Sequence, residues 1–203
     1  MLRTSVRSRV TLFALALFGF ATISAAQAGP ESEKGFLPHG SRQWFVLGAA
    51  AEPLPIHSRD DGRTFVMTAL TWGRIMFSPR GPSVLRGQLE WGFELMPLMR
   101  MHQSPTTWAF GGSPIFFRWR MKERRGIAPY LELNGGAMYS NHEVPEHVSR
   151  FNFTAQTGAG FLVRLTSKHS LVLGYRLHHI SNGGIGPGTR SVNSNVLISG
   201  VTF

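Results

Sequence analysis

Apolar residues alternate with polar or small residues through most of this chain, and this two-residue period constrains the fold more than any other feature. The alternating segments span roughly ten to fourteen residues between turn residues, a pattern typical of strands in an outer-membrane β-barrel. Eight such segments can be counted, and an even number closes an antiparallel barrel without unpaired edges. We therefore predict an all-β, eight-stranded antiparallel transmembrane barrel of the bacterial outer membrane. The predicted strands are residues 43–52, 64–76, 84–96, 108–120, 127–139, 152–165, 169–180 and 192–203.

The first residues of the chain predict export from the cytoplasm. Three arginines within the first nine residues precede an uninterrupted apolar or small run over residues 10–23, and Ala26 and Ala28 stand where a cleavage site requires small residues. This combination is typical of a secretory signal peptide, and the run is too short for a transmembrane helix. We expect residues 1–28 to be the signal peptide and residues 29–203 to form one outer-membrane β-barrel domain.

Composition limits the partners of such a domain. The chain has no cysteine, so an exported domain of this kind depends on packing and backbone pairing instead of disulfides. The formal net charge is +10, and the three arginines of the leader leave +7 for the remainder. A basic surface suits anionic partners such as lipopolysaccharide phosphates, whereas export argues against nucleic acid. No later apolar run reaches the length of about eighteen residues that a membrane-spanning helix needs.

Alternation assigns one face of each strand to lipid and the other to the barrel interior. In the third segment, Trp91 and Phe93 are expected to face lipid, while Glu90 and Glu94 face inward. The inner face is expected to be mostly polar. Because an eight-stranded barrel has room inside only for side chains, the inward charges are expected to pair and not to line a conducting pore. These charges are Glu90, Glu94, Glu132, Arg118, Arg120, Arg164 and Arg176.

The connections between strands predict the orientation in the membrane. Short periplasmic turns and longer external loops are typical of such barrels, and this places both ends of the barrel on the periplasmic side. The terminal Phe203, with apolar residues alternating before it, resembles the signal read by the outer-membrane barrel assembly machinery, an expected partner. The predicted short turns lie near residues 79–82, 122–126 and 166–168, and the predicted loops near 53–63, 97–107, 140–150 and 182–191.

The strongest functional signal lies in residues 175–184, where a histidine and a serine stand two residues apart on one face of the seventh strand. This strand runs outward, so His179 and Ser181 are expected at the external rim, on the lipid-facing side. With a rise of about 3.3 Å per residue and a tilt near 40°, His179 stands roughly 25 Å above the periplasmic turn. Polar groups on a lipid face are costly and favour a functional role, with a place in the interfacial girdle as the alternative. The neighbouring His178 is expected to face inward as a structural residue.

A known family shares these features. The sequence His-Ile-Ser-Asn at residues 179–182, with Leu-Gly-Tyr-Arg at 173–176 before it and a glycine-rich loop after it, resembles the PagL-type lipid A 3-O-deacylases, or outer-membrane acyloxyacyl hydrolases. The likeness extends to residues 89–97, 129–136 and 151–153, and so to most of the chain after the leader. It implies a serine esterase that removes the ester-linked 3-O-acyl chain from lipid A of lipopolysaccharide in the outer leaflet.

The resemblance also implies a role for individual residues. Ser181 would be the nucleophile and His179 its general base, while the Asn182 side-chain amide and the Gly184 backbone N–H would form the oxyanion hole. The family's acid stands in the last strand, twelve residues after the serine, where this chain has Asn193. An amide can orient an imidazole, but it cannot stabilise an imidazolium by charge. Reduced activity is therefore expected.

Several alternatives remain open at this point. Glu143 or Glu146, in the external loop beside the sixth strand, could supply the missing charge, although both also fit solvated loop residues. The nearby His142 and His147 match no strong metal-ligand spacing, and no metal or other cofactor is expected. A non-catalytic small barrel serving structure, lipid binding or adhesion is the alternative from a different functional class. A homodimer is a further open possibility.

Overall fold

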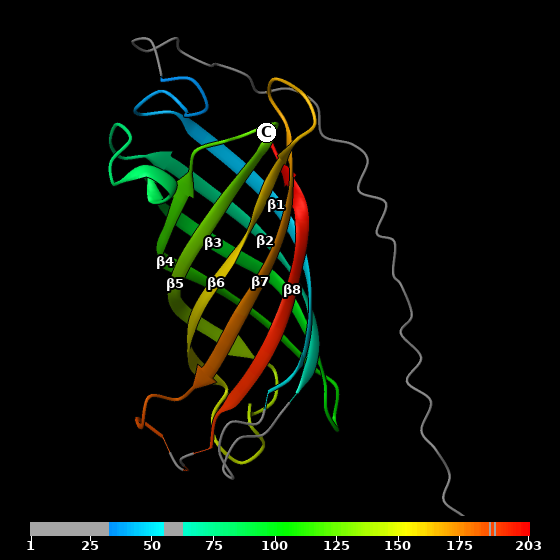
Figure 1. The fold of residues 1–203 in the computed structure, drawn as a ribbon. Coiled ribbons are helices and arrows are strands. Elements are labelled where there is room, and N and C mark those ends of the chain that lie inside the picture. Colours follow the sequence, from blue (N-terminus) through cyan, green and yellow to red (C-terminus); the bar gives the residue numbers. More distant parts are fainter. Residues whose placement is uncertain (1–32, 55–62, 187, 189) are drawn as a thin grey trace, which may run out of the picture.

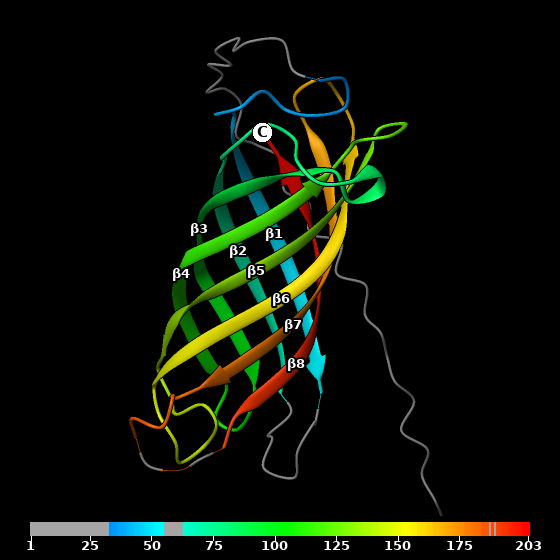
Figure 2. The ribbon, with the colours of Figure 1, turned by 60° about the vertical axis from the view of Figure 1, so that its left-hand side comes forward.

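A computed structural model describes residues 33–203 except 55–62, 187 and 189, so the predicted signal peptide, residues 1–28, lies outside the described residues. The strands form one closed barrel in which each is antiparallel to the next and the last pairs with the first (Figures 1 and 2). The predicted eight-stranded barrel is therefore confirmed. The strands are β1 (Arg42–Pro53), β2 (Thr64–Ile75), β3 (Gly87–His102), β4 (Thr107–Met121), β5 (Ile127–Ser140), β6 (Phe151–Arg164), β7 (Ser170–Ser181) and β8 (Val192–Thr202).

The third strand differs from its prediction at both ends. The first residues of the predicted strand form a short 3-10 helix instead, η1 (Ser83–Leu85). At the other end, β3 continues beyond Pro97 to His102. Pro97 lies where the register between β3 and β4 shifts, between Met96 and Met99, and an irregular ladder accommodates a residue without an N–H.

This longer strand changes two connections. The link after β3 shrinks to residues 103–106, while the link between β2 and β3 occupies residues 76–86. The expected contrast in length is therefore wrong for these two links. It holds for the short turns 122–126 and 165–169 against the longer links 141–150 and 182–191.

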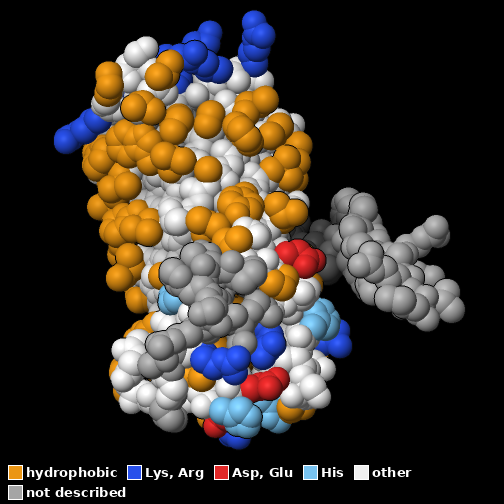
Figure 3. Space-filling view, turned by 60° about the horizontal axis from the view of Figure 1, so that its bottom comes forward, with side chains coloured by type: hydrophobic (Ala, Val, Ile, Leu, Met, Phe, Trp, Pro, Cys, Tyr) orange, Lys and Arg blue, Asp and Glu red, His pale blue; other side chains and the backbone are white. Residues whose placement is uncertain are grey.

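The two faces of the wall differ as the alternation predicts. On β3 the side chains of Glu90 and Glu94 are buried inside the barrel, whereas Trp91 and Leu95 are exposed on its outer face. Hydrophobic side chains cover a band of the outer surface, with charged side chains at the two ends (Figure 3). Among the described residues, no helix is long and apolar enough to cross a membrane.

Buried ion pairs tie four strands together inside the barrel. Arg118 of β4 lies 2.9 Å from Glu132 Oε2 of β5 and 3.5 Å from Glu90 Oε2 of β3. Arg176 of β7 lies 2.6 Å from Glu132 Oε1 and 2.8 Å from Glu94 Oε1. The predicted pairing of inward charges is confirmed for these residues. Because each of these five buried charges has an opposite partner, the network fixes the strands relative to one another.

The two remaining predicted charges lie elsewhere. Arg120 is buried, but its Nη1 donates to Gln43 Oε1 at 2.9 Å instead of pairing with a carboxylate. Arg164 stands at the barrel mouth, where β6 ends, with 51% of its side chain exposed, and it pairs with Glu123 of the adjacent turn. Its expected place inside the barrel is therefore wrong, because the strand ends before the side chain can be enclosed.

The interior is less polar than predicted toward the end where β7 finishes. Buried methionines fill this part, and Met67 of β2 stands directly opposite Met99 of β3. Met101 and Met138 are buried in the same cluster. Flexible thioether side chains fill irregular spaces well, which suits a narrow lumen of varying width. The core is thus ionic in its middle layer and apolar beneath the candidate site.

Candidate active site

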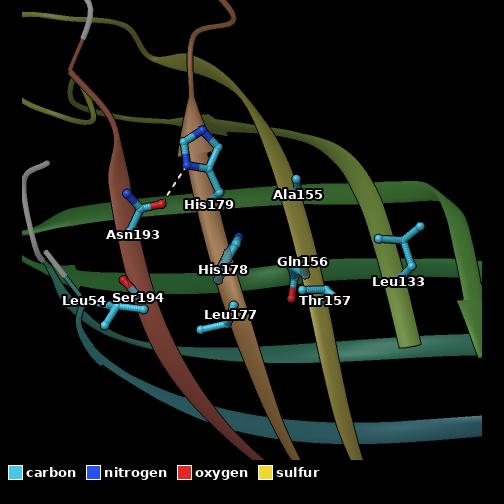
Figure 4. A pocket seen from close by; sticks show the side chains of 10 residues that line it. All are labelled: Leu54, Leu133, Ala155, Gln156, Thr157, Leu177, His178, His179, Asn193 and Ser194. Atoms are coloured by element: carbon cyan, nitrogen blue, oxygen red, sulfur yellow. Dashed lines mark hydrogen bonds between the residues drawn. The ribbon is translucent and has the colours of Figure 1, made fainter. Parts of the chain in front are cut away.

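The outward end of β7 carries the candidate site on the outer face of the barrel. Successive side chains point to opposite faces, so His178 is buried inside at 2% exposure while His179 is half-buried outside. The His178 ring packs edge-on against Phe65, with 5.5 Å between ring centroids. In the sheet, His179 stands between Ala155 of β6 and Asn193 of β8 (Figure 4). His178 is therefore a packed interior residue, as predicted, but its two ring nitrogens have no hydrogen-bond partner among the described residues, so the expectation of a satisfied histidine is wrong.

Asn193 holds the His179 imidazole. The two side chains point toward each other, and His179 Nδ1 lies 2.7 Å from Asn193 Oδ1 (Figure 4). A carbonyl oxygen only accepts hydrogen bonds, so in this pair Nδ1 carries a hydrogen, and in the neutral ring Nε2 keeps its lone pair. That is the ring state a general base requires. The structure therefore brings the predicted third residue to the predicted base.

Ser181 ends β7 on the same face as His179 and stands opposite Phe153 of β6. Its side chain is half-buried. Within the described part of the chain, no hydrogen bond joins Ser181 to His179, whose one side-chain partner is Asn193. Catalytic hydrogen bonds are often long in ligand-free enzymes and shorten when substrate binds. The two residues therefore lie on one face of β7 without a hydrogen bond between them.

The loop after β7 contains the two predicted oxyanion donors. Gly183 and Gly184 adopt positive φ angles of 63° and 77°, a conformation that glycine accepts without steric cost. The Gly184 N–H donates to Asn182 Oδ1 at 3.0 Å, and Asn182 Nδ2 lies 3.5 Å from the Gly188 oxygen. Both donors therefore bond within the loop here. To face an oxyanion together, the Asn182 side chain must first release the Gly184 N–H.

The two glutamates considered as alternative acids have other partners. Glu146 forms an ion pair with Arg63 at 3.7 Å, and the backbone oxygen of Glu143 accepts from Gln103 Nε2 at 3.1 Å. Neither carboxylate contacts His179, whose Nδ1 is already bonded to Asn193. The described residues contain no group of three or more His, Asp or Glu side chains arranged to hold a metal ion.

A hollow of about 290 Å³ opens in the outer wall beside His179 (Figure 4). Its outer-face lining is mostly apolar and comes from adjacent strands: Leu133, Thr157 and Leu177 form one cross-strand row. The small side chain of Ala155 stands next to His179 in the following row and leaves the space open. Sequence reasoning missed this hollow, because it exists only once the register of β5 to β8 is known. Its size and apolar lining suit part of an acyl chain.

Comparison with known proteins decides the family. The sequence model of the family described as lipid A 3-O-deacylase (PagL) matches residues 72–202. The chain belongs to this family. The matched segment contains every candidate residue from His179 to Asn193. At the level of the PagL family, membership indicates ester hydrolysis with lipid A as the substrate.

Solved structures show the same fold. The crystal structure of the outer membrane enzyme PagL superposes with a TM-score of 0.57 at 15% identity, covering 79% of this chain and 98% of that one. Neisserial surface protein A gives a TM-score of 0.52 at 14% identity, covering 79% and 95%. None of the curated proteins matches this chain in sequence. The PagL-family chain therefore shares the closed β-barrel fold of these two proteins.

Proposed function

We propose that this chain is a serine esterase that removes the 3-O-linked acyl chain from lipid A. The observation that carries the proposal is the 2.7 Å hydrogen bond between His179 and Asn193, made on the lipid-facing side of the barrel. It orients a basic nitrogen two residues before a serine, next to an apolar hollow. The lipid-facing side of a membrane barrel contacts lipid and not bulk water, so an ester embedded in a membrane leaflet can reach this site, whereas a water-soluble ester is excluded from it.

The proposed orientation places the site in the outer leaflet. The short turns 122–126 and 165–169 lie at the end of the barrel where β8 finishes, and the links 141–150 and 182–191 lie at the opposite end, where β7 finishes (Figure 1). Short turns face the periplasm in barrels of this type. The site at the end of β7 would then meet lipopolysaccharide. Export by residues 1–28, which lie outside the described residues, is part of the same proposal.

Acylation would use Ser181 and His179 as a unit. His179 Nε2 takes the hydroxyl proton while Ser181 Oγ attacks the ester carbonyl, and the carbonyl oxygen gains the negative charge. When the tetrahedral intermediate collapses, the bond to the 3-oxygen of the sugar breaks. That oxygen receives the proton from His179, which leaves a deacylated lipid and an acyl-serine. A water molecule then attacks the acyl-serine with His179 again as base, releasing the fatty acid and restoring Ser181.

Two elements would stabilise this reaction. The Asn182 amide and the Gly184 N–H would donate to the oxyanion after the bond between them opens, and open space of at least 4 Å surrounds the Cβ position of Gly184. Asn193 would hold the imidazole in the required tautomer. Because Asn193 carries no charge, the imidazolium formed during catalysis would lack its usual counterion, so we propose a slower enzyme than one with a carboxylate at this position.

The mass of lipid A from cells tests the proposal. Cells producing the full chain should yield lipid A lighter by one 3-O-acyl chain, and Ser181→Ala and His179→Ala should each abolish this change, since nucleophile and base act together. Two other residues give matched controls: Ser199→Ala removes an outward serine exposed on β8, six residues beyond Asn193, and His178→Ala removes the inward histidine adjacent to His179. Both controls should remain active.

Unchanged lipid A in cells whose outer membrane contains the folded protein would favour a non-catalytic barrel instead. Full activity of Ser181→Ala would exclude Ser181 as the nucleophile. Heat-modifiable migration in detergent gels would confirm that each variant is folded before its activity is judged.

A further inference from the structure

The end of the barrel opposite the candidate site is strongly basic. Among the described residues, this end has two acids, Glu33 and Glu123, and both are already paired. Glu33 lies 2.8 Å from Arg86 Nη2 and 3.6 Å from Lys122 Nζ, while Glu123 pairs with Arg164. Lysine and arginine side chains cap the upper end of the apolar band in Figure 3. The further cations at this end are Lys34, Arg42, Arg74, Arg80, Arg124, Arg125 and Lys168.

Two of these cations stand side by side on the lipid-facing surface. Arg42 of β1 is the direct register partner of Arg74 of β2, and both side chains are exposed. The Arg74 guanidinium lies 3.8 Å from the point where a side chain at Gly40 would begin, so it points toward the end of the barrel. No acid among the described residues pairs with either arginine. Like charges directly opposite on a sheet repel each other, and an anion between them would remove this cost.

An aromatic cluster lies next to this pair on the same face. Trp44 is paired in register with Trp72, Trp72 with Phe93, and Arg74 with Trp91. The Trp72 and Phe93 rings stack with centroids 5.6 Å apart, and Trp44 and Trp91 each approach a ring of the cluster edge-on at 6.2 Å. Tryptophan at this level of a barrel marks the boundary between headgroups and acyl chains. The two cations therefore lie at headgroup level, with aromatic rings on the hydrocarbon side.

We propose that Arg42, Arg74 and this aromatic cluster bind one anionic phospholipid of the inner leaflet. The lipid phosphate lies between the two guanidiniums, whose planar N–H groups match phosphate oxygens, and the first part of the acyl chains lies against Trp44 and Trp72. The positive potential of the whole end favours a lipid with net negative charge over a zwitterionic one. The assignment to the inner leaflet rests on the membrane orientation given with the proposed function.

Native mass spectrometry of the purified, folded barrel in detergent tests this site. The probes are phosphatidylglycerol, phosphatidylcholine with matched acyl chains, and lipid A. The unmodified protein should retain one phosphatidylglycerol molecule in preference to phosphatidylcholine. In the double variant Arg42→Gln/Arg74→Gln, the preference for phosphatidylglycerol over phosphatidylcholine should fall roughly thirtyfold, since two cations next to an anionic headgroup are removed. The double variant Arg42→Lys/Arg74→Lys should keep part of it.

The matched control removes the same charge from the same end. The variant Arg80→Gln/Arg124→Gln changes two arginines of the periplasmic links and should bind phosphatidylglycerol as the unmodified protein does. Equal loss in this control, or no preference in the unmodified protein, would overturn the site. Retention of lipid A at Arg42 and Arg74 in preference to phosphatidylglycerol would overturn the inner-leaflet assignment. The measurement involves no ester hydrolysis, so selective binding by a protein that leaves lipid A intact would support this site while refuting the proposed esterase.

Discussion

Replacing Asn193 with aspartate should accelerate deacylation. Aspartate has the shape of asparagine, so a carboxylate oxygen would replace Oδ1 at 2.7 Å from His179 Nδ1 without movement of β8. Glutamate should also help, because it too adds charge, but Asn193 is only 8% exposed and the longer side chain must bend to reach the same atom. We therefore expect Asn193→Asp to gain more than Asn193→Glu.

The magnitude follows from the change in hydrogen-bond type. A neutral hydrogen bond contributes about 1 kcal/mol net, and one with a charged partner about 1.5–3 kcal/mol. The added stabilisation of the imidazolium is then about 0.5–2 kcal/mol, or roughly 2- to 30-fold in kcat. The reverse change in serine proteases, Asp→Asn, costs roughly 10⁴-fold and sets an upper limit. Partial desolvation of a carboxylate on the lipid-facing wall keeps the expected gain well below that limit.

Release of fatty acid from lipid A in detergent measures this effect with purified variants. Asn193→Ala should lower turnover about tenfold, since the ring loses the acceptor that fixes its tautomer. Asn195→Asp is the matched control: Asn195 lies on the same face of β8, accepts a hydrogen bond from Tyr175, and pairs in register with Leu177. Equal rates for the two aspartate variants would refute the argument. A greater loss in Glu143→Gln or Glu146→Gln than in Asn193→Ala would assign the charge to the loop.

Two further changes test the scaffold. Glu132→Gln leaves Arg118 and Arg176 without their shared buried counterion. The free energy of unfolding, measured by urea titration of the refolded barrel, should therefore fall by about 3–5 kcal/mol. The control Glu146→Gln, which breaks a surface ion pair, should lower it by about 1 kcal/mol or less. The Phe203 backbone exchanges two 3.0 Å hydrogen bonds with Trp44 where the barrel closes. Deleting Phe203 should reduce the amount of heat-modifiable protein in the outer membrane, while Phe203→Tyr should not. Wild-type levels after the deletion would contradict a terminal assembly signal.

Strand number, strand faces and most strand ends could be predicted from the sequence, because a two-residue period is a property of each segment by itself. The end of β3 could not be predicted, because proline usually ends a strand. Pro97 is tolerated within β3 because the register with β4 shifts at this point. The interior place of Arg164 was wrong for a related reason. Parity gives the face of a residue but does not show where the enclosing wall stops.

The candidate residues were accessible to sequence reasoning, but their surroundings were not. The spacing of His179 and Ser181 and their resemblance to a family pattern located the pair, and the same pattern pointed to Asn193. The apolar hollow and the opposed arginines Arg42 and Arg74 depend on which residues face each other across strands. Register is fixed by pairs of strands and by the connections between them, so no single segment reveals it.

Strand β7 links the ionic interior to the outward site. Arg176 points inward and is held by Glu132 and Glu94 through three hydrogen bonds, which fixes the strand in position and rotation. Because side chains alternate, fixing Arg176 on one face also fixes Leu177 and His179 on the other. The imidazole is therefore positioned by the barrel wall, and under the proposed function a membrane lipid would reach it by lateral diffusion. The proposed reaction requires Ser181 to approach His179 and the Asn182 side chain to turn away from the Gly184 N–H, so both adjustments lie at the end of β7 and in the loop after it.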